Sequence, residues 1–169
     1  EKLAQAMRYT LLSEGKRVRP ILAIAACEAV GGRTARVLPF ACALEMIHAY
    51  SLIHDDLPAM DDDDLRRGRP TNHVVFGEGM AVLAGDGLQA EAFALLAREP
   101  RSSDAHLAAR KLRVIRAVGD AAGSTGMVGG QAIDLQAGGQ TRGEWIALDA
   151  AGLRAMHARK TGALIRASA

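Results

Sequence analysis

Six aspartates fall within ten residues of this sequence, as a pair at Asp55-Asp56 and a run over 61–64, and they follow directly on an apolar segment, residues 39–53. An apolar segment of this length is expected to pack as a core helix. The first two carboxylates would then lie at its C-terminal end, where the helix dipole is negative and the acids also repel one another. The sequence therefore predicts a buried helix end with positive charge bound against it.

Helices are expected throughout the chain. Alanine and leucine are abundant, aromatic residues make up only 4% of the 169 residues, and alternating β-branched runs are scarce. We therefore expect an all-α protein with one domain over residues 1–169. Proline, glycine and the apolar periodicity predict helices over 20–30, 39–53, 80–97, 104–121, 124–136 and 148–169, with loops over 15–19 and 66–79.

Charge and cysteine usage exclude several classes of protein. The formal net charge is +2 and the charged residues are interspersed, which gives no support to nucleic-acid binding. Cys27 and Cys42 lack the spacing of a zinc site, so we expect reduced, buried thiols and a cytoplasmic protein. The first residues show no secretory signal pattern. Residues 39–53 are too few to span a bilayer and include Glu45 and His48, so we expect no membrane insertion.

The spacing of the aspartates suits a divalent cation. Mg²⁺ takes oxygen ligands and is usually bound by one or two carboxylates together with water and substrate phosphates. On an uninterrupted helix Asp55 and Asp61 would point about 240° apart and could not share a face. Pro58 lies between them, and its missing backbone donor predicts a bulge that brings the two carboxylates together. We therefore predict Mg²⁺ at Asp55 and Asp61, with Mn²⁺ as the alternative ion.

A basic run, Leu65-Arg66-Arg67-Gly68-Arg69, follows the aspartates directly. Ion pairing is the commoner relation between adjacent acidic and basic runs on a protein surface. Guanidinium groups also bind phosphate oxygens in a two-pronged manner, and a metal held by carboxylates binds the same phosphates from another side. The two runs together therefore indicate a diphosphate site.

These residues resemble a known family. Residues 45–54 (EMIHAYSLIH) and the acidic and basic runs after them are similar to the first aspartate-rich motif of the trans-isoprenyl diphosphate synthases, or polyprenyl synthetases. Within that family they most resemble the bacterial farnesyl diphosphate synthases, also called geranyltranstransferases. Segments beginning at Gly15, Pro70, Gly129 and Lys160 agree in the same order. The resemblance implies an isoprenoid synthase fold, with antiparallel helices around a central cavity, usually in a homodimer. Because a second aspartate-rich motif is absent, it also implies an N-terminal portion, incomplete at the C-terminus.

The resemblance assigns roles to individual residues at the predicted diphosphate sites. It implies that Asp55 and Asp61 bind Mg²⁺ on an allylic diphosphate, and that Arg66 contacts the same ester. Isopentenyl diphosphate would be bound by three basic side chains and one histidine, which are Lys16, Arg19, Arg67 and His48.

Further roles fall on the cavity itself. Lys160 and Thr161 resemble a catalytic pair that lies beside the developing cation, and Gln131 resembles a substrate-binding residue of the cavity wall. Tyr50 and Ser51 lie about one helical turn before the first aspartate and are the candidates for a floor that sets the length of the product.

The implied activity is that of a magnesium-dependent prenyltransferase. An allylic diphosphate, dimethylallyl or geranyl, would ionise, isopentenyl diphosphate would attack the cation, and proton loss would leave a product one isoprene unit longer. We expect farnesyl diphosphate as the product. The alternatives are a geranylgeranyl diphosphate synthase and a noncatalytic subunit that regulates a partner synthase. A metal-dependent phosphohydrolase, suggested by His54-Asp55, would leave Arg66, Arg67 and Lys160 without a role.

Overall fold

The computed structural model describes residues 1–143 and 145–169. Its helices are α1 (Lys2–Leu11), α2 (Val18–Ala29), α3 (Thr34–Asp55), α4 (Asn72–Phe76), α5 (Glu78–Arg98), α6 (Ala105–Ala122), α7 (Met127–Ala137), α8 (Ala150–His157), the π-helical turn η1 (Ala158–Gly162) and α9 (Ala163–Arg166). The strands in this described part are β1 (Leu65–Arg66) and β2 (Arg69–Pro70), which form one antiparallel hairpin. The prediction of an all-α fold is confirmed.

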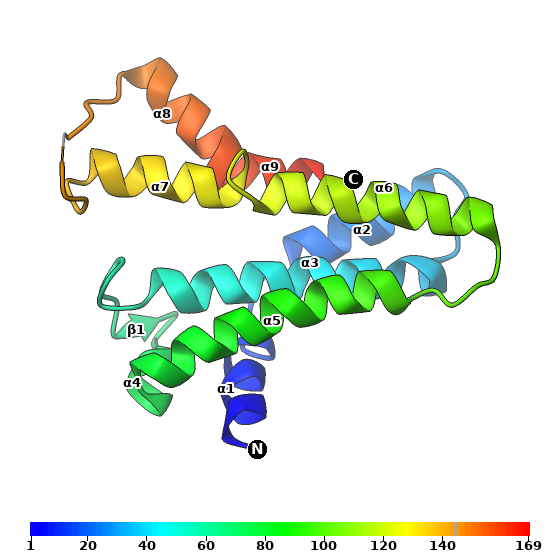
Figure 1. Cartoon of the computed structure of the whole chain (residues 1–169), viewed down its shortest axis with the longest axis horizontal. Coiled ribbons are helices and arrows are strands. Elements are labelled where there is room, and N and C mark those ends of the chain that lie inside the picture. Colours follow the sequence, from blue (N-terminus) through cyan, green and yellow to red (C-terminus); the bar gives the residue numbers. More distant parts are fainter. Residues whose placement is uncertain (144) are drawn as a thin grey trace.

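The helices are arranged in two layers (Figure 1). In one layer α3 and α5 lie side by side, and α1 and α4 pack against α5. In the other layer α6 and α7 follow one another above α3 and α5 in the view, and η1 packs against α7. Helix α2 contacts both α3 and α9 and therefore joins the layers.

The hydrophobic core is centred on the contact between α3 and α5. Fully buried alanines on both helices let the backbones approach closely, and larger side chains such as Leu44, Ile47 and Leu88 fill the remaining space. Gly85 of α5 faces His54 of α3, and an added Cβ there would lie 2.1 Å from His54 Nε2. The same nitrogen lies 3.0 Å from the carbonyl oxygen of Val82, within hydrogen-bond distance. The imidazole of His54 thus occupies the space that Gly85 leaves and fixes the last turn of α3 against α5.

Several helix boundaries differ from the predicted ones. Helix α3 begins at Thr34, so Pro39 does not open it but lies inside its second turn. Its missing N–H removes a single helical hydrogen bond there, which the long helix tolerates. Helix α2 begins at Val18, and Pro20 falls in its first turn as expected. Helix α7 begins at Met127, three residues later than predicted.

Four elements were not predicted: α1, the β1–β2 hairpin, α4 and η1. Helix α1 buries only Ala6 completely. The expected loop over 66–79 contains the second half of the hairpin and the short helix α4. Arg67 and Gly68 both have positive φ angles, 54° and 75°, which is the geometry of a two-residue hairpin turn. The final helix is interrupted by the π-helical turn η1.

Helices α3 and α5 are each long and apolar enough to cross a membrane, by length and composition alone. The expectation that the first apolar segment is too short is therefore wrong, because α3 has 22 residues. A buried core helix gives the same signal, and α3 and α5 supply most of the buried residues of the core.

The cysteines also differ from expectation. Cys27 and Cys42 are both unpaired, but Cys27 is partly exposed and Cys42 is exposed. Helix α3 turns Ala41, Ala43 and Leu44 toward the core, which leaves the side chain between them on the outer face.

We predict that Gly85→Ala destabilises the protein by about 1–3 kcal/mol, the usual effect of overpacking, because the new methyl group meets the His54 ring. Gly79→Ala is the matched control in the same helix, since a Cβ there meets nothing within 4 Å. That control should stabilise the protein by up to about 1 kcal/mol through helix propensity. Thermal unfolding midpoints of both variants and the parent measure the difference. A Gly85→Ala protein as stable as the Gly79→Ala protein would contradict the assigned contact.

Candidate active site

A cavity of about 740 Å³ lies between the C-terminal half of α3 and the facing α7 and η1. Its walls are largely apolar, with Leu57 and Met60 on one side and Met127 and Leu135 on the other. Eight of the residues that the sequence singled out line it, and these are Arg19, His48, Tyr50, Ser51, Asp55, Gln131, Lys160 and Thr161. An apolar cavity with a few convergent polar groups is the usual form of a small-molecule site.

The aspartate cluster is organised by a reversal of the chain. Helix α3 ends at Asp55, and the N–H of Met60 donates to the Leu57 carbonyl oxygen over 2.8 Å in the turn that follows. The N–H of Asp61 then donates to the carbonyl oxygen of Asp55 at 2.9 Å. Asp61 therefore returns to the helix end, next to Asp55, as the sequence predicts. The predicted cause is wrong, because the helix terminates before Pro58 instead of continuing through a bulge.

The electrostatics of Asp55 favour a bound cation. Burial raises the pKa of Asp55 to about 6, and the charges of Asp61 and Asp56 act in the same direction, whereas Lys160 and Arg66 oppose them. A cation would relieve both the desolvation and the repulsion. Within the described residues no group of three or more His, Cys, Asp or Glu side chains could hold a metal ion. Mg²⁺ usually binds one or two carboxylates and completes its shell with water and phosphate oxygens, and the paired carboxylates of Asp55 and Asp61 fit that requirement.

Asp56 is structural and was missed by the sequence reading. It is 2% exposed, and its Oδ1 accepts hydrogen bonds from Arg66 Nε at 2.8 Å and Nη2 at 2.5 Å. Burial raises the pKa of Asp56 and its bond to Arg66 opposes that rise. The ion pair attaches the β1–β2 hairpin to the end of α3. For this pair, therefore, the acidic and basic runs do pair with one another, and the predicted contact of Arg66 with an allylic ester stays a prediction.

A second pocket, of about 170 Å³, shares Arg19, His48 and Leu52 with the cavity. Its other lining groups include three basic side chains, those of Lys16, Arg17 and Arg67. We call this the basic pocket.

His48 does not add to the positive charge of the basic pocket. Burial, together with the charges of Arg19, Arg67, Arg66 and Arg17, lowers its pKa to about 4. The imidazole is therefore neutral at pH 7, and the positive charge of the pocket is carried by lysine and arginine alone.

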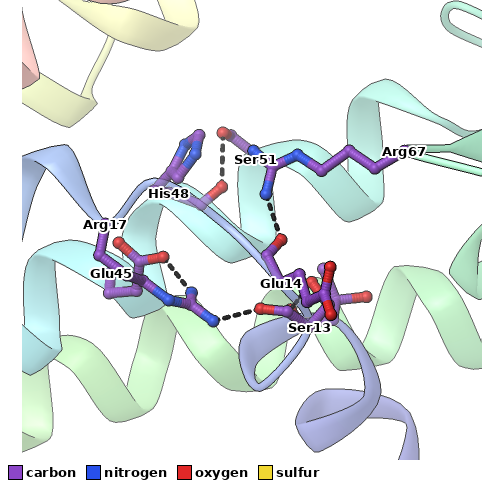
Figure 2. Close-up of polar contacts among 8 residues, drawn as sticks. Ser13, Glu14, Arg17, Glu45, His48, Ser51 and Arg67 are labelled. Atoms are coloured by element: carbon purple, nitrogen blue, oxygen red, sulfur yellow. Dashed lines mark hydrogen bonds and ion pairs between the residues drawn. The ribbon is translucent and has the colours of Figure 1, made fainter.

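Arg67 reaches the basic pocket from the hairpin turn (Figure 2). Its guanidinium donates a hydrogen bond to the carbonyl oxygen of Glu14. Gly15 makes this approach possible, since an added Cβ would lie 2.6 Å from Arg67 Nη1. The hairpin after the aspartates and the loop after α1 thus meet at the basic pocket. The order of the motifs in the sequence did not predict this contact.

Lys160 and Thr161 lie in the π-helical turn η1, on the wall that faces α3. Gly130 brings α7 and η1 together, because a Cβ at that position would lie 2.2 Å from the backbone nitrogen of Lys160. Lys160 Nζ donates to Asp134 Oδ2 at 2.5 Å, which holds the ammonium group in place. Single π-helical turns are often found at functional sites.

Gln131 is the buried polar residue of the same wall. It is 9% exposed, and both its side-chain nitrogen and oxygen have no hydrogen-bond partner within the described part of the chain. Buried amide groups normally form hydrogen bonds, so these atoms are available to a molecule in the cavity. Two other predicted residues, Asp61 and Arg66, line neither the cavity nor the basic pocket.

Comparison with known proteins shows the family. The polyprenyl synthetase family model matches residues 1–169, and the chain belongs to this family. It is 53% identical to "Geranylgeranyl pyrophosphate synthase 7, chloroplastic" of Arabidopsis thaliana, with 99% of this chain and 46% of that protein covered. It is 49% identical to the farnesyl diphosphate synthase of Geobacillus stearothermophilus, with 99% and 54% covered.

The fold agrees with solved structures. An FPP/GFPP synthase from Zymomonas mobilis, in its apo form, matches with a TM-score of 0.89 and 44% identity, over 98% of this chain and 57% of that one. The isoprenyl synthase fold is therefore confirmed. The chain spans about half the length of the relatives that it matches.

Proposed function

We propose that the complete protein is a trans-prenyltransferase that joins isopentenyl diphosphate to an allylic diphosphate. The observation that carries the proposal is the position of two charged sites beside one apolar cavity. Asp55 and Asp61 lie together at the end of α3, and the basic pocket shares Arg19 and His48 with the cavity. Two diphosphate headgroups would bind at these sites, with the allylic hydrocarbon in the cavity. The names of the farnesyl and geranylgeranyl synthases that the chain resembles support this reading.

The residues of the chain would act mainly by binding and by electrostatics. Mg²⁺ held by Asp55 and Asp61 would supply positive charge to the allylic diphosphate as it departs. Lys160 and Thr161 would contact that headgroup from the opposite wall, and the ammonium group would stabilise its growing negative charge. Neutral His48 would donate a hydrogen bond to isopentenyl diphosphate.

Exclusion of water would protect the allylic cation. The apolar side chains of Leu57, Met60, Met127 and Leu135 line the cavity and would keep water from the carbocation. The alkene of isopentenyl diphosphate would attack the cation, and the proton lost afterwards would pass to the departing diphosphate. This scheme needs no covalent intermediate with the protein.

We propose farnesyl diphosphate as the product and Tyr50 as the floor of the cavity. Tyr50 is 5% exposed and lines the cavity. Its ring packs edge to face on the His54 ring, with 5.8 Å between the ring centroids. Ser51 is smaller, and its hydroxyl donates to the His48 carbonyl oxygen at 2.9 Å. A geranylgeranyl product is the second candidate, because relatives with that name match as well. A homodimer is proposed from the family resemblance alone, and a cytoplasmic location is proposed from the unpaired cysteines.

We predict that the complete protein, with Mg²⁺ or Mn²⁺, isopentenyl diphosphate and an allylic primer, forms prenyl diphosphates, and that EDTA abolishes the reaction. Asp55→Asn and Asp61→Asn should each lower kcat by about 10²- to 10³-fold, because each removes charge that supports the leaving group. Asp120→Asn, an exposed acid on α6 with the same substitution, is the control and should keep full activity. Products are measured by chromatography. No turnover by the parent would favour a noncatalytic subunit, and phosphate release without chain growth would favour a phosphohydrolase.

We predict that Tyr50→Ala lengthens the products of the complete enzyme, because the cavity would extend past the missing ring. Tyr9→Ala, which removes an aromatic ring from α1 outside the cavity, should leave product length unchanged. The chromatographic product profile decides the point. An identical profile for Tyr50→Ala and the parent would remove Tyr50 as the floor.

A further inference from the structure

The basic pocket contains an acidic residue to which the proposed reaction gives no role. Glu45 lies in the middle of α3, its side chain is 13% exposed, and it is the single acidic residue among the described residues that line this pocket. By charge alone, a carboxylate placed there would weaken the binding of a diphosphate. Its presence therefore needs another explanation.

The contacts of Glu45 supply that explanation (Figure 2). Arg17 donates one hydrogen bond from Nη1 to Glu45 Oε1 and another from Nη2 to the carbonyl oxygen of Ser13. Glu45 belongs to α3, Ser13 follows α1, and Arg17 immediately precedes α2. A single guanidinium group thus ties together three segments of the chain around the pocket.

The backbone at Arg17 also depends on this tie. Arg17 has a φ angle of 48°, in the left-handed region that residues with a side chain rarely adopt. Such a conformation persists only where surrounding contacts hold it. The bonds to Glu45 and Ser13 are side-chain contacts of that kind, and they fix the turn from which α2 begins.

The neighbours of Arg17 are the residues that would bind isopentenyl diphosphate. Lys16 precedes it, Arg19 lies two residues after it, and both line the pocket. Arg19 is partly buried, its Nε has no hydrogen-bond partner within the described part of the chain, and the nearby charge of Glu45 opposes the lowering of its pKa by burial. The directions of Lys16 and Arg19 are therefore set by the turn that Arg17 holds.

We propose that Glu45 is a positioning residue, which acts through Arg17 to hold Lys16 and Arg19 in place for the diphosphate of isopentenyl diphosphate. The proposal rests on the proposed function. It makes Arg17 a structural tether and leaves its two neighbours free to bind the ligand.

The direction in which Glu45→Gln changes the KM for isopentenyl diphosphate distinguishes a positioning role from a purely electrostatic one. Glu45→Gln removes a negative charge from the pocket, so a purely electrostatic role predicts tighter binding of isopentenyl diphosphate. The positioning role predicts weaker binding. In the complete enzyme we expect the KM for isopentenyl diphosphate to rise about 10- to 100-fold, the effect of losing a hydrogen bond to a charged group. The KM for the allylic substrate should stay within about twofold, because Asp55, Asp61 and Lys160 do not depend on this tie.

A double-mutant cycle tests whether Glu45 acts through Arg17. Arg17→Met should raise the same KM to a similar extent, and the double variant should be no worse than either single one, since the two residues act as a unit. Additive losses would overturn the proposal. Glu91→Gln is the control, because Glu91 pairs with Arg98 at 3.2 Å on an exposed part of α5 and loses the same charge. It should leave both KM values unchanged.

A further variant covers the case in which Glu45→Gln does not fold. Arg17→Lys keeps the positive charge but loses the guanidinium group that donates two hydrogen bonds. The positioning role therefore predicts a raised KM for isopentenyl diphosphate, whereas a purely electrostatic role predicts an unchanged KM. An unchanged or lowered KM for isopentenyl diphosphate in an active enzyme would overturn the proposal while leaving the proposed function intact. A parent enzyme without any prenyl product would instead refute the proposed function, and the positioning role with it.

Discussion

The candidate site depends on how rigidly the end of α3 is held. Three contacts hold it: His54 fills the space beside Gly85, Asp56 pairs with Arg66, and the Asp61 N–H returns to the Asp55 carbonyl oxygen. None of them uses the carboxylate of Asp55, which is partly buried and forms no hydrogen bond or ion pair with residues 1–143 and 145–169. Among these aspartates, Asp56 thus supports the structure, while the charge of Asp61 lies close enough to Asp55 to raise its pKa. Supporting contacts of this kind are what a preorganised site requires.

The two charged sites beside the cavity carry opposite charges, one an excess of acidic and the other an excess of basic side chains. Acids are concentrated at the end of α3, where burial and mutual repulsion raise the pKa of Asp55 to about 6. Cations are concentrated in the basic pocket, where they and burial keep His48 neutral. Each imbalance raises the energy of the free protein. A metal-bound allylic diphosphate would relieve the first, and the diphosphate of isopentenyl diphosphate would relieve the second. The like charges that would bind ligands thus destabilise the folded protein, and contacts such as those of Arg17 with Glu45 and Ser13 hold the charged segments in place.

The sequence predicted the structure best where a local pattern is compatible with a single local structure. Apolar periodicity and flanking breakers predicted α5 and α6 within two residues, and the spacing of Asp55, Pro58 and Asp61 predicted that the two acids lie together. It failed where the decisive contact joins distant segments. Nothing local shows that Asp56 pairs with Arg66, that Arg17 binds Glu45, or that Gly85 makes room for His54. The hairpin was missed because two-residue strands are too short to show an alternating pattern.

The central claim is that Asp55 and Asp61 hold a divalent cation on a diphosphate ester. A crystal structure of the complete protein with Mn²⁺ and an allylic thiolodiphosphate, which resists ionisation, tests it most directly through the anomalous signal of the metal. The account predicts a peak bound by oxygens of Asp55, Asp61 and the diphosphate, at about 2.1 Å. A peak bound elsewhere, or a diphosphate bound in the cavity with both aspartates turned away from the metal, would contradict it.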